Sequence, residues 1–315
     1  MKSISVIVPI KNEQDTLAQF FNRLIPVLEN IYSKYEVICV NDGSNDKSLE
    51  IINNFCMLNK NIKLLNLSKN FGAYNAVRAG STIVENELSL WLAADLQDPP
   101  EFLLEMQSYI KKGYDVVWGV RKNRKDPILR KLLTIVFYKI LNLVSEIPYP
   151  PKGVDLCLMN SKVRNLFNNL NEKSGFIQAL VINLGFNQKF IEYERNERIA
   201  GVSKWKSYRK LFHMAIEMIS TTSNFPINLL LYLGVFGLPI VLVKFIYDFF
   251  NFQSELQIIF NLILILLFTI FLVGGWLGLY IFKSLSEVRN RPVFYIEKSL
   301  NLSKNQLKIF NSQYD

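Results

Sequence analysis

Histidine and cysteine are scarce in this chain of 315 residues, which contains one histidine and three cysteines. With His213 alone, a Ser-His-Asp triad is not expected and a histidine-rich metal site is excluded. The odd number of widely spaced cysteines, without a metal-ligand pattern, indicates a reducing compartment rather than a disulfide framework. The chain also lacks a GxGxxG motif after its first apolar run and a GxxxxGK[ST] motif anywhere, which argues against dinucleotide-binding and P-loop folds.

Charge is unevenly distributed along the chain, whose formal net charge is +9. Residues 1–110 contain 9 Lys/Arg and 13 Asp/Glu, whereas residues 111–139 contain 9 basic and 2 acidic residues. The acidic part suits a metal and its ligands, and the basic segment suits phosphates or an anionic membrane surface. A solvated basic face is the commoner explanation for such a segment.

Strand and helix patterns alternate through the first 121 residues, which predicts an α/β domain with a mainly parallel sheet. The first apolar run is short, contains Pro9 and continues into the polar KNEQD, so it is expected to be a strand rather than a signal peptide. The mixed region 154–210 has one strand signal, QKFIEYER, and the polar tail after Glu297 is expected to be loosely ordered. The predicted strands of the first part are 3–10, 35–44, 61–68, 87–94 and 114–121.

Two long apolar runs near the C-terminus predict a transmembrane helical hairpin. Residues 229–243 are apolar, and residues 262–282 contain no charge over a length of about 20 residues, which is what a bilayer span needs. Lys244 lies at the end of the first run, and the linker at roughly 248–257 carries only acidic charges. Both outer flanks are basic, so both flanks are expected to face the cytoplasm. The alternative is a very apolar helix pair buried in a soluble domain.

Polar residues follow each of the first four predicted strands, where ligands bind in open α/β sheets. The fourth strand ends in WLAADLQDPPE, which carries Asp95, Gln97 and Asp98. Because Asp95 and Gln97 are two positions apart, an extended backbone would direct both side chains toward one face. Their oxygen atoms suit a hard divalent cation that meets a diphosphate. Ordinary turn chemistry is the alternative for any single strand end.

The motifs VIVPIKNE, VNDGSND, LSKNFG and ADLQDPPE, in this order, resemble the family 2 glycosyltransferases with the GT-A fold. Within that family the chain looks like bacterial polyprenyl-phosphate glycosyltransferases, relatives of dolichol-phosphate mannose synthase. The later stretches GYDVVWGVRKNR and YERNERIAGVSKWKSYRKL extend the resemblance to about Ser3–Pro292. It implies an α/β fold, a GT-A-type Rossmann-like and mostly parallel sheet with a C-terminal transmembrane helical hairpin. The implied parts are a cytoplasmic catalytic domain (1–205), an amphipathic juxtamembrane helix (206–225), two transmembrane helices (226–284) and a cytoplasmic tail (285–315).

The resemblance also implies roles for individual residues. Asp95 and Gln97 match positions that bind Mg²⁺ or Mn²⁺ and, through the metal, the donor diphosphate. The expected catalytic residues are Asp95, Asp98 and Asp155. The expected donor-binding residues are Pro9, Asn12, Glu13, Asp42, Ser44, Lys69, Asn70 and Gly72. The residues expected to bind the acceptor phosphate or the diphosphate are Arg121, Arg124, Lys125, Arg195, Arg198, Ser203 and Lys204.

Two positions depart from the family pattern. Ala93 stands where the commonest family form, Asp-Ala-Asp-Leu-Gln, has its first Asp, which removes one carboxylate from the metal region. Cys157 stands two residues after Asp155, where the family often has Arg. Both departures weaken the expected geometry of the site more than the expected function.

The implied reaction is inverting transfer of one sugar from a nucleotide-sugar, UDP-linked by resemblance, to polyprenyl (undecaprenyl) phosphate. It would take place at the cytoplasmic face of the bacterial inner membrane and give a polyprenyl-phosphate sugar for cell-envelope glycan modification. The acceptor phosphate is ionised at neutral pH, so a strong general base is dispensable. Nucleic acid is not an expected partner, and a homotetramer is allowed although the sequence leaves the oligomeric state open.

Three other functions remain as alternatives. A processive polysaccharide synthase would share the donor domain, but the chain lacks a QxxRW motif and a larger membrane part. A glycosyltransferase acting on another lipid, such as diacylglycerol, is harder to exclude. A catalytically silent, membrane-anchored nucleotide-sugar binding protein is favoured by Ala93 and opposed by the acidic and basic residues that are present.

Overall fold

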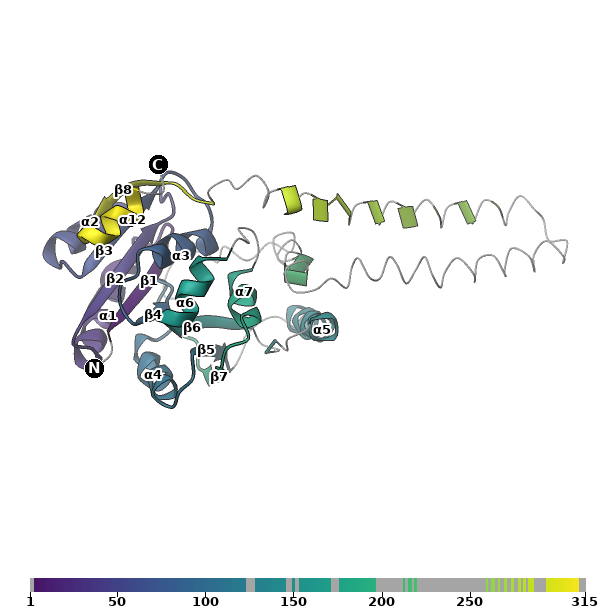
Figure 1. Cartoon of the computed structure of the whole chain (residues 1–315), viewed down its shortest axis with the longest axis horizontal. Coiled ribbons are helices and arrows are strands. Elements are labelled where there is room, and N and C mark those ends of the chain that lie inside the picture. The colour runs from purple at the N-terminus through teal and green to yellow at the C-terminus, as the bar shows by residue number, and fades with distance from the viewer. Residues whose placement is uncertain are drawn as a thin grey trace.

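The computed structural model of the chain describes residues 3–122, 128–145, 149–150, 153–170, 176–196 and 293–311, together with scattered positions between 212 and 285. For residues 128–131, 144, 310 and 311 it describes the backbone only. The described parts form an α/β domain around one mixed sheet (Figure 1).

Eight strands form this sheet in the order β7-β5-β6-β4-β1-β2-β3-β8. Four neighbouring strands, β4, β1, β2 and β3, are parallel to one another, and β5 is parallel to β7. The expected α/β fold with a mostly parallel sheet is therefore confirmed. The strands are β1 (Ile4–Ile10), β2 (Tyr35–Asn41), β3 (Ile62–Leu67), β4 (Leu88–Trp91), β5 (Val116–Arg121), β6 (Val154–Asn160), β7 (Gln188–Tyr193) and β8 (Ile296–Leu300).

Helices cover both faces of the sheet, which explains why its central strands are apolar at nearly every position. Along β1, Val6 and Val8 belong to one hydrophobic cluster and Ile7 to the other, because successive side chains point to opposite faces. The first cluster contains residues of α1 (Leu17–Ile31), α2 (Ser48–Leu58) and α4 (Leu103–Lys111), which follows the short 3₁₀ helix η1 (Pro100–Phe102). The second contains residues of α3 (Ala73–Thr82), α5 (Ile128–Val144), α6 (Ser161–Asn168) and α7 (Ile177–Asn183).

The mixed region after residue 153 contains more regular structure than its sequence predicts. Strand β6 lies between β4 and β5 and is antiparallel to both. Its register pairs Cys157 with Trp91 on one side and with Trp118 on the other. The side chain of Cys157 is fully buried in the second hydrophobic cluster with these two tryptophans. This departure from the family pattern therefore lies in the core.

The expectation of a loosely ordered tail after Glu297 is wrong. Strand β8 pairs antiparallel with β3 at the edge of the sheet, and α12 (Lys304–Asn311) follows it. The tail is polar, but its polar groups form long-range hydrogen bonds with the domain. The Asn301 side chain, for example, donates to the carbonyl oxygens of Cys56 (2.6 Å) and Ile62 (2.8 Å). A strand and a helix near the C-terminus thus complete the domain that begins with β1.

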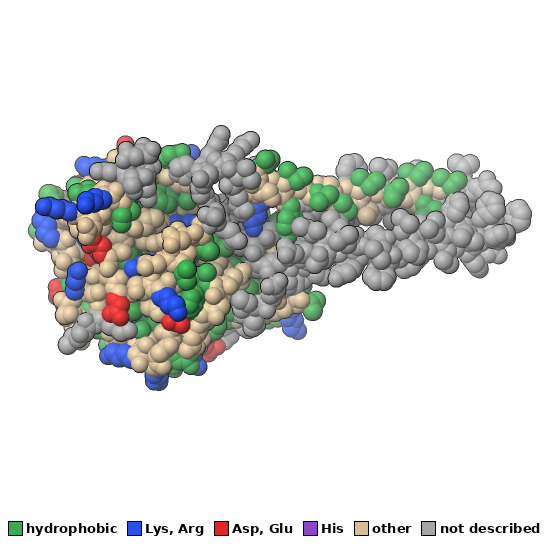
Figure 2. Space-filling model, viewed as in Figure 1, with side chains coloured by type: hydrophobic (Ala, Val, Ile, Leu, Met, Phe, Trp, Pro, Cys, Tyr) green, Lys and Arg blue, Asp and Glu red, His purple; other side chains and the backbone are tan. Residues whose placement is uncertain are grey.

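The predicted membrane hairpin lies outside the described residues, apart from scattered positions between 259 and 285. Those positions are helical, and several carry exposed apolar side chains, such as Leu266 (62% exposed) and Ile281 (60% exposed). Figure 2 shows hydrophobic side chains along this part of the chain, while charged side chains lie on the body that carries the sheet. Within the described residues, we find no helix that is both long and apolar enough to cross a membrane.

Candidate active site

The loops that follow β1, β2, β3 and β4 lie at one edge of the sheet, because these neighbouring strands run parallel. Residues 11–16, 42–47, 68–72 and 92–99 form these loops. They carry the expected donor-binding residues and the Asp95–Asp98 motif; Pro9 belongs to β1 itself. The structure thus gathers residues that are up to about 90 positions apart in the sequence.

Side-chain hydrogen bonds join the first loop to the second. The backbone N–H of Asn12 donates to the Ser44 hydroxyl (3.0 Å), and Asn45 N–H donates to the Asn12 side chain (2.8 Å). Glu13 N–H donates to the Ser48 hydroxyl at the start of α2 (2.8 Å). Asn12 adopts a positive φ of 52°, a conformation that asparagine tolerates better than most residues. Asn12 and Ser44 therefore lie together, as expected for residues of one pocket.

Asp42 joins the second loop to the third. It is 3% exposed, and its two carboxylate oxygens accept the backbone N–H groups of Phe71 (2.6 Å) and Gly72 (3.0 Å). Gly72 N–H also donates to the Asn70 side chain (3.0 Å), and the Lys69 ammonium lies 5.1 Å from the centre of the Phe71 ring. Any contact of Asp42 with a nucleotide base would therefore be made by a carboxylate that already organises the neighbouring loop.

The loop after β4 does not have the extended backbone expected from its sequence. Leu96 has a positive φ of 58°, so the chain turns between Asp95 and Gln97, and the argument that alternation directs both side chains to one face is wrong. Gln97 N–H donates to the Asp95 carboxylate (3.3 Å). The Gln97 side-chain amide donates to the carbonyl oxygen of Asn196 (3.4 Å), whose N–H donates back to Gln97 O (2.8 Å).

Asp95 and Gln97 still fit a magnesium or manganese ion. Both are partly buried, and the Gln97 amide nitrogen is used by Asn196, which leaves the amide oxygen as the atom suited to a cation. One carboxylate and one amide oxygen suffice for an ion whose other ligands are substrate phosphates and water. No cluster of three or more His, Cys, Asp or Glu side chains suited to a metal occurs among the residues that the structure describes. The protein atoms alone would thus supply only part of a coordination shell.

Asp98 is held in a buried polar cluster with the end of β7. It is 3% exposed, and one of its oxygens accepts hydrogen bonds from the Tyr193 hydroxyl (2.5 Å) and from Arg195 Nε (2.9 Å). Burial raises the pKa of Asp98 to about 6; the nearby Asp155 and Asp95 act in the same direction, and Arg195 opposes them. Burial, with the nearby carboxylates, raises the pKa of Tyr193, so its hydroxyl stays protonated as a donor.

Arg121 and Asp155 form a second ion pair next to this cluster. Nη2 of Arg121 donates to one Asp155 oxygen (2.6 Å) and Nε donates to the other, so the pair is bidentate. Burial alone would lower the pKa of Arg121, but the carboxylates of Asp155 and Asp98 raise it, and the guanidinium stays charged. The structure therefore joins an expected phosphate-binding residue to an expected catalytic one.

Tyr193 and Asn196 are parts of the site that the sequence did not single out. The Tyr193 ring stacks on Phe102 with ring centres 5.0 Å apart, while its hydroxyl reaches Asp98. The available signal was the position of Tyr193, an aromatic residue that ends a strand two positions before Arg195. The expected site residues Arg124, Lys125, Arg198, Ser203 and Lys204 lie outside the described residues.

An open cleft of about 670 Å³ lies beside α2, and Asp95 is not among the residues that line it. It is lined by Gln14, by Asn45, Asp46 and Lys47 of the second loop, and by residues of α2. None of the expected site residues borders it. The chemistry-bearing side chains at the strand ends therefore mark the candidate site better than this cleft does.

Comparison with known proteins identifies similar sequences over nearly the whole chain. Residues 5–177 match glycosyl transferase family 2. The chain is 33% identical to the "uncharacterized glycosyltransferase YkcC" of Bacillus subtilis, covering 96% of each chain. It is 30% identical to the undecaprenyl-phosphate 4-deoxy-4-formamido-L-arabinose transferase of Pectobacterium atrosepticum, covering 96% of this chain and 94% of that protein. It is also 30% identical to the SfII prophage-derived bactoprenol glucosyl transferase of Shigella flexneri, covering 94% and 98%.

Proposed function

The chain belongs to glycosyl transferase family 2, and from this premise we propose that it transfers a single sugar from a nucleotide-sugar, UDP-linked, to polyprenyl phosphate. One observation carries the choice of acceptor. The similarity to a protein named as an undecaprenyl-phosphate sugar transferase extends over 96% of this chain, well beyond residues 5–177 of the family match. The proposal thus draws on the C-terminal part as well as on the catalytic domain.

The donor would occupy the edge of the sheet where the four loops meet. The interlocked loops carrying Asn12, Ser44 and Asp42 would hold the nucleoside, and Lys69 and Asn70 would lie along the sugar diphosphate. These contacts are supported by the rigid hydrogen bonding between the loops, because a prearranged pocket loses less entropy when the donor binds.

Asp95 and Gln97 would hold Mg²⁺ or Mn²⁺ together with the donor diphosphate. When bound, such an ion stabilises the negative charge of the departing nucleoside diphosphate. Ala93 leaves this set with fewer carboxylates than the usual family motif. Substrate oxygens would therefore supply more of the coordination.

The protein's own residues would orient the two substrates. The acceptor phosphate attacks the anomeric carbon in line with the leaving diphosphate: a carbon–oxygen bond to the acceptor forms as the bond to the donor breaks, and the configuration inverts. No proton needs to be removed, because the phosphate is already ionised. The Asp98–Arg195 pair and the partly buried Arg121–Asp155 pair would fix the wall of the site on the acceptor side.

The lipid acceptor places this reaction at a membrane. We propose that the apolar runs at 229–243 and 262–282 form the hairpin that anchors the chain in the bacterial inner membrane, with the catalytic domain on the cytoplasmic side. The basic residues that follow β5, between positions 122 and 139, would face the anionic surface. Assembly into a homotetramer is compatible with this arrangement.

The decisive experiment uses the purified full chain in detergent with undecaprenyl phosphate, Mg²⁺ or Mn²⁺, and radiolabelled nucleotide sugars. We expect one donor to transfer its label to the lipid fraction. A parallel reaction with diacylglycerol in place of undecaprenyl phosphate tests the alternative lipid acceptor, because label transferred only to diacylglycerol would contradict the proposed acceptor. Clear nucleotide binding without a lipid-linked product from any donor would refute the enzyme and support the alternative that Ala93 favours, a silent nucleotide-sugar binding protein.

A further inference from the structure

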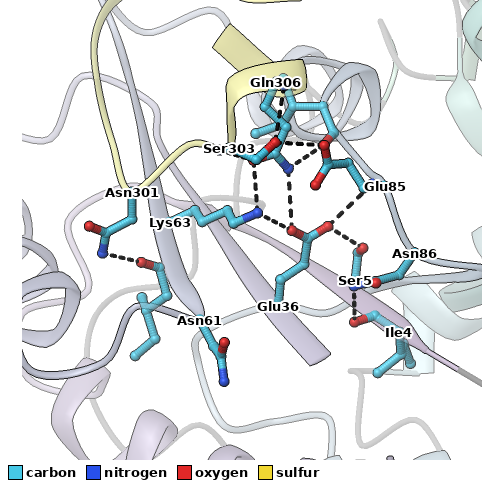
Figure 3. Close-up of polar contacts among 12 residues, drawn as sticks. Ile4, Ser5, Glu36, Asn61, Lys63, Glu85, Asn86, Asn301, Ser303 and Gln306 are labelled. Atoms are coloured by element: carbon cyan, nitrogen blue, oxygen red, sulfur yellow. Dashed lines mark hydrogen bonds and ion pairs between the residues drawn. The ribbon is translucent and has the colours of Figure 1, made fainter. Parts of the chain in front are cut away.

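The C-terminal segment 293–311 is firmly attached to the catalytic sheet (Figure 3). Gln306, fully buried, accepts a hydrogen bond from the Lys63 ammonium (2.7 Å) and donates one to the carbonyl oxygen of Ile83 (2.6 Å). Lys63 also pairs with Glu36, and both are less than 10% exposed. Since Gln306 completes the hydrogen bonding of a buried ion pair, it fixes α12 and, with it, β8.

A bulge in β8 directs one acidic residue toward the sheet. The register pairs Leu67 with Ile296 but Asn66 with Lys298, so β8 has an extra residue, Glu297, at this point. The Glu297 carboxylate accepts a hydrogen bond from the Asn66 side-chain amide (3.0 Å). The bulge thus places the Glu297 carboxylate beside Asn66, near the end of β3 and just before the loop that follows this strand.

From Asn66, hydrogen bonds continue across the sheet to the second loop. The Asn66 side-chain oxygen accepts from the Asn41 amide (2.6 Å), and the Asn41 oxygen accepts from the backbone N–H of Ser44 (3.3 Å). Asn41 and Asn66 are 1% and 8% exposed, so water contributes little to satisfying them. A continuous series of three hydrogen bonds therefore joins Glu297 to Ser44.

The direction of this series follows from its acidic end. An ionised carboxylate can only accept, so Asn66 must turn its NH₂ group toward Glu297 and its oxygen toward Asn41. Asn41 must then offer its NH₂ group to Asn66, which leaves its oxygen to face Ser44 N–H. If either amide were reversed, two like groups would face each other inside the protein.

The same segment also contacts the third loop. Ser68 N–H donates to the carbonyl oxygen of Tyr295 (3.0 Å), and the rings of Tyr295 and Phe71 lie 6.2 Å apart. Residues 295 and 297 therefore touch, directly or through Asn66 and Asn41, two of the loops that line the proposed donor pocket.

We propose that Glu297 is a positioning residue for the nucleotide-sugar: its carboxylate sets the orientation of Asn66 and Asn41 and so holds the Ser44 loop in its donor-binding form. The effect on donor binding rests on the proposed function, whereas the hydrogen bonds from Glu297 to Ser44 do not depend on it. Glu297 does not touch the reacting atoms and acts through the two asparagines.

The test compares four forms of the full chain in detergent: wild type, Glu297→Gln, Glu297→Lys, and Glu297→Lys with Asn66→Asp. Gln can still accept from Asn66. Lys can only donate, which removes the acceptor that orients the series. In the double variant, the Asp at position 66 accepts from Lys and from Asn41, so Asn41 keeps its oxygen toward Ser44. Glu105→Lys, an exposed site on α4, controls for the change in charge.

Four quantities are measured: the hydrogen-exchange rate of the Ser44 amide, the affinity for UDP, the donor KM and kcat. For Glu297→Lys we expect exchange roughly five- to tenfold faster, a similar loss of UDP affinity and increase in donor KM, and kcat within about twofold of wild type. Glu297→Gln, Glu105→Lys and the double variant should stay within about twofold of wild type in all of them.

Unchanged exchange in Glu297→Lys, or no recovery in the double variant, would overturn the proposal. Faster exchange with unchanged UDP affinity would also overturn it, because the hydrogen bonds from Glu297 to Ser44 would then not contribute to donor binding. If the wild-type protein transfers no sugar to any lipid, the proposed function fails, and the exchange and UDP-binding results still decide the role of Glu297.

Discussion

Asp98 and Arg195 form an ion pair of 2.9 Å that is almost entirely enclosed, with the Asp98 side chain 3% and the Arg195 side chain 17% exposed. The pair joins the loop after β4 to the segment after β7, and the backbone hydrogen bond from Asn196 to Gln97 runs beside it. Two segments about 95 residues apart in sequence are therefore held together by this ion pair and by the hydrogen bonds beside it.

Arg195→Ala is expected to destabilise the protein by about 3–5 kcal/mol, because a buried Asp98 would lose its cationic partner. Adding Asp98→Asn to it should recover part of this loss, since the neutral amide needs no counter-charge and can still accept from Tyr193. Thermal unfolding of the wild type and both variants in detergent measures the effect. An unchanged unfolding temperature for Arg195→Ala would contradict a stabilising role for the pair.

Asp95→Asn is expected to raise the metal concentration needed for half-maximal sugar transfer by at least about tenfold. The substitution removes the one carboxylate among the proposed metal ligands and leaves only the Gln97 amide beside the new one. Removal of divalent ions with EDTA should abolish transfer, and Mg²⁺ or Mn²⁺ should restore it. UDP binding measured without metal should change little. An unaltered metal dependence in Asp95→Asn would exclude Asp95 as a ligand, and Glu105→Gln serves as the control.

Gly43→Ala tests how tightly the second and third loops approach each other. Gly43 has φ of +63°, and a Cβ there would lie 2.8 Å from Asn70 N and from the Lys69 carbonyl carbon. We expect a loss of about 1–3 kcal/mol in stability and weaker UDP binding. Gly113→Ala is the matched control, because Gly113 also has a positive φ (+93°) but has open space around it. Equal effects on UDP binding in both variants would argue against loop contact as the cause.

Gln306→Ala should lower the free energy of unfolding by about 3 kcal/mol, because the buried Lys63 and the carbonyl oxygen of Ile83 would each lose a hydrogen-bond partner. Asn305→Ala, at an exposed position of the same helix, should change stability by less than about 0.5 kcal/mol. Chemical unfolding followed by tryptophan fluorescence provides the measurement. Similar losses in both variants would mean that helix propensity, not the buried contact, explains the effect.

The three cysteines should be unreactive in the native protein. Cys39, Cys56 and Cys157 are at most 2% exposed, and burial raises the pKa of the Cys56 thiol to about 12 and those of the other two well above the ordinary value. A thiol reagent at pH 8 should label none of them until the protein is unfolded, and then all three. The thiols ionise at lower pH in the unfolded chain, so these groups favour unfolding as the pH rises above about 9. Rapid labelling of the native protein would contradict their burial.

Much of the sheet could be predicted because its strands are buried on both faces and are therefore apolar throughout, as in β1 and β2. Strand β8 could not, since its sequence IEKSL is largely polar and its stability comes from β3 and from hydrogen bonds such as that of Asn301 with Cys56. A local pattern carries no information about partners some 240 residues away. Strand β6 was not predicted for the same reason: it lies between β4 and β5 and runs antiparallel to both.

The gathering of the candidate residues at one edge of the sheet was predictable, but their detailed geometry was not. Parallel strands bring their ends to one edge, so Asp42 and Asp95 had to lie at the same edge of the sheet, in the loops after β2 and β4 on either side of the loop after β1. The positive φ of Leu96 has no signature in sequence, because leucine rarely adopts it, and the expected alternation of Asp95 and Gln97 failed there. Likewise, the hydrogen bond from Tyr193 to Asp98 depends on the pairing of β7 with β5, which only the fold reveals.

The position of β8 has a consequence for biosynthesis. The ribosome completes β7 about 100 residues before it produces β8, and at roughly 5–20 residues per second this interval lasts roughly 5–20 s. Throughout that time the outer edge of β3 has no strand beside it, and exposed strand edges promote aggregation. The nascent catalytic domain therefore cannot complete its sheet while the intervening apolar segments are being made, and β3 gains its second neighbour only when β8 has been synthesised.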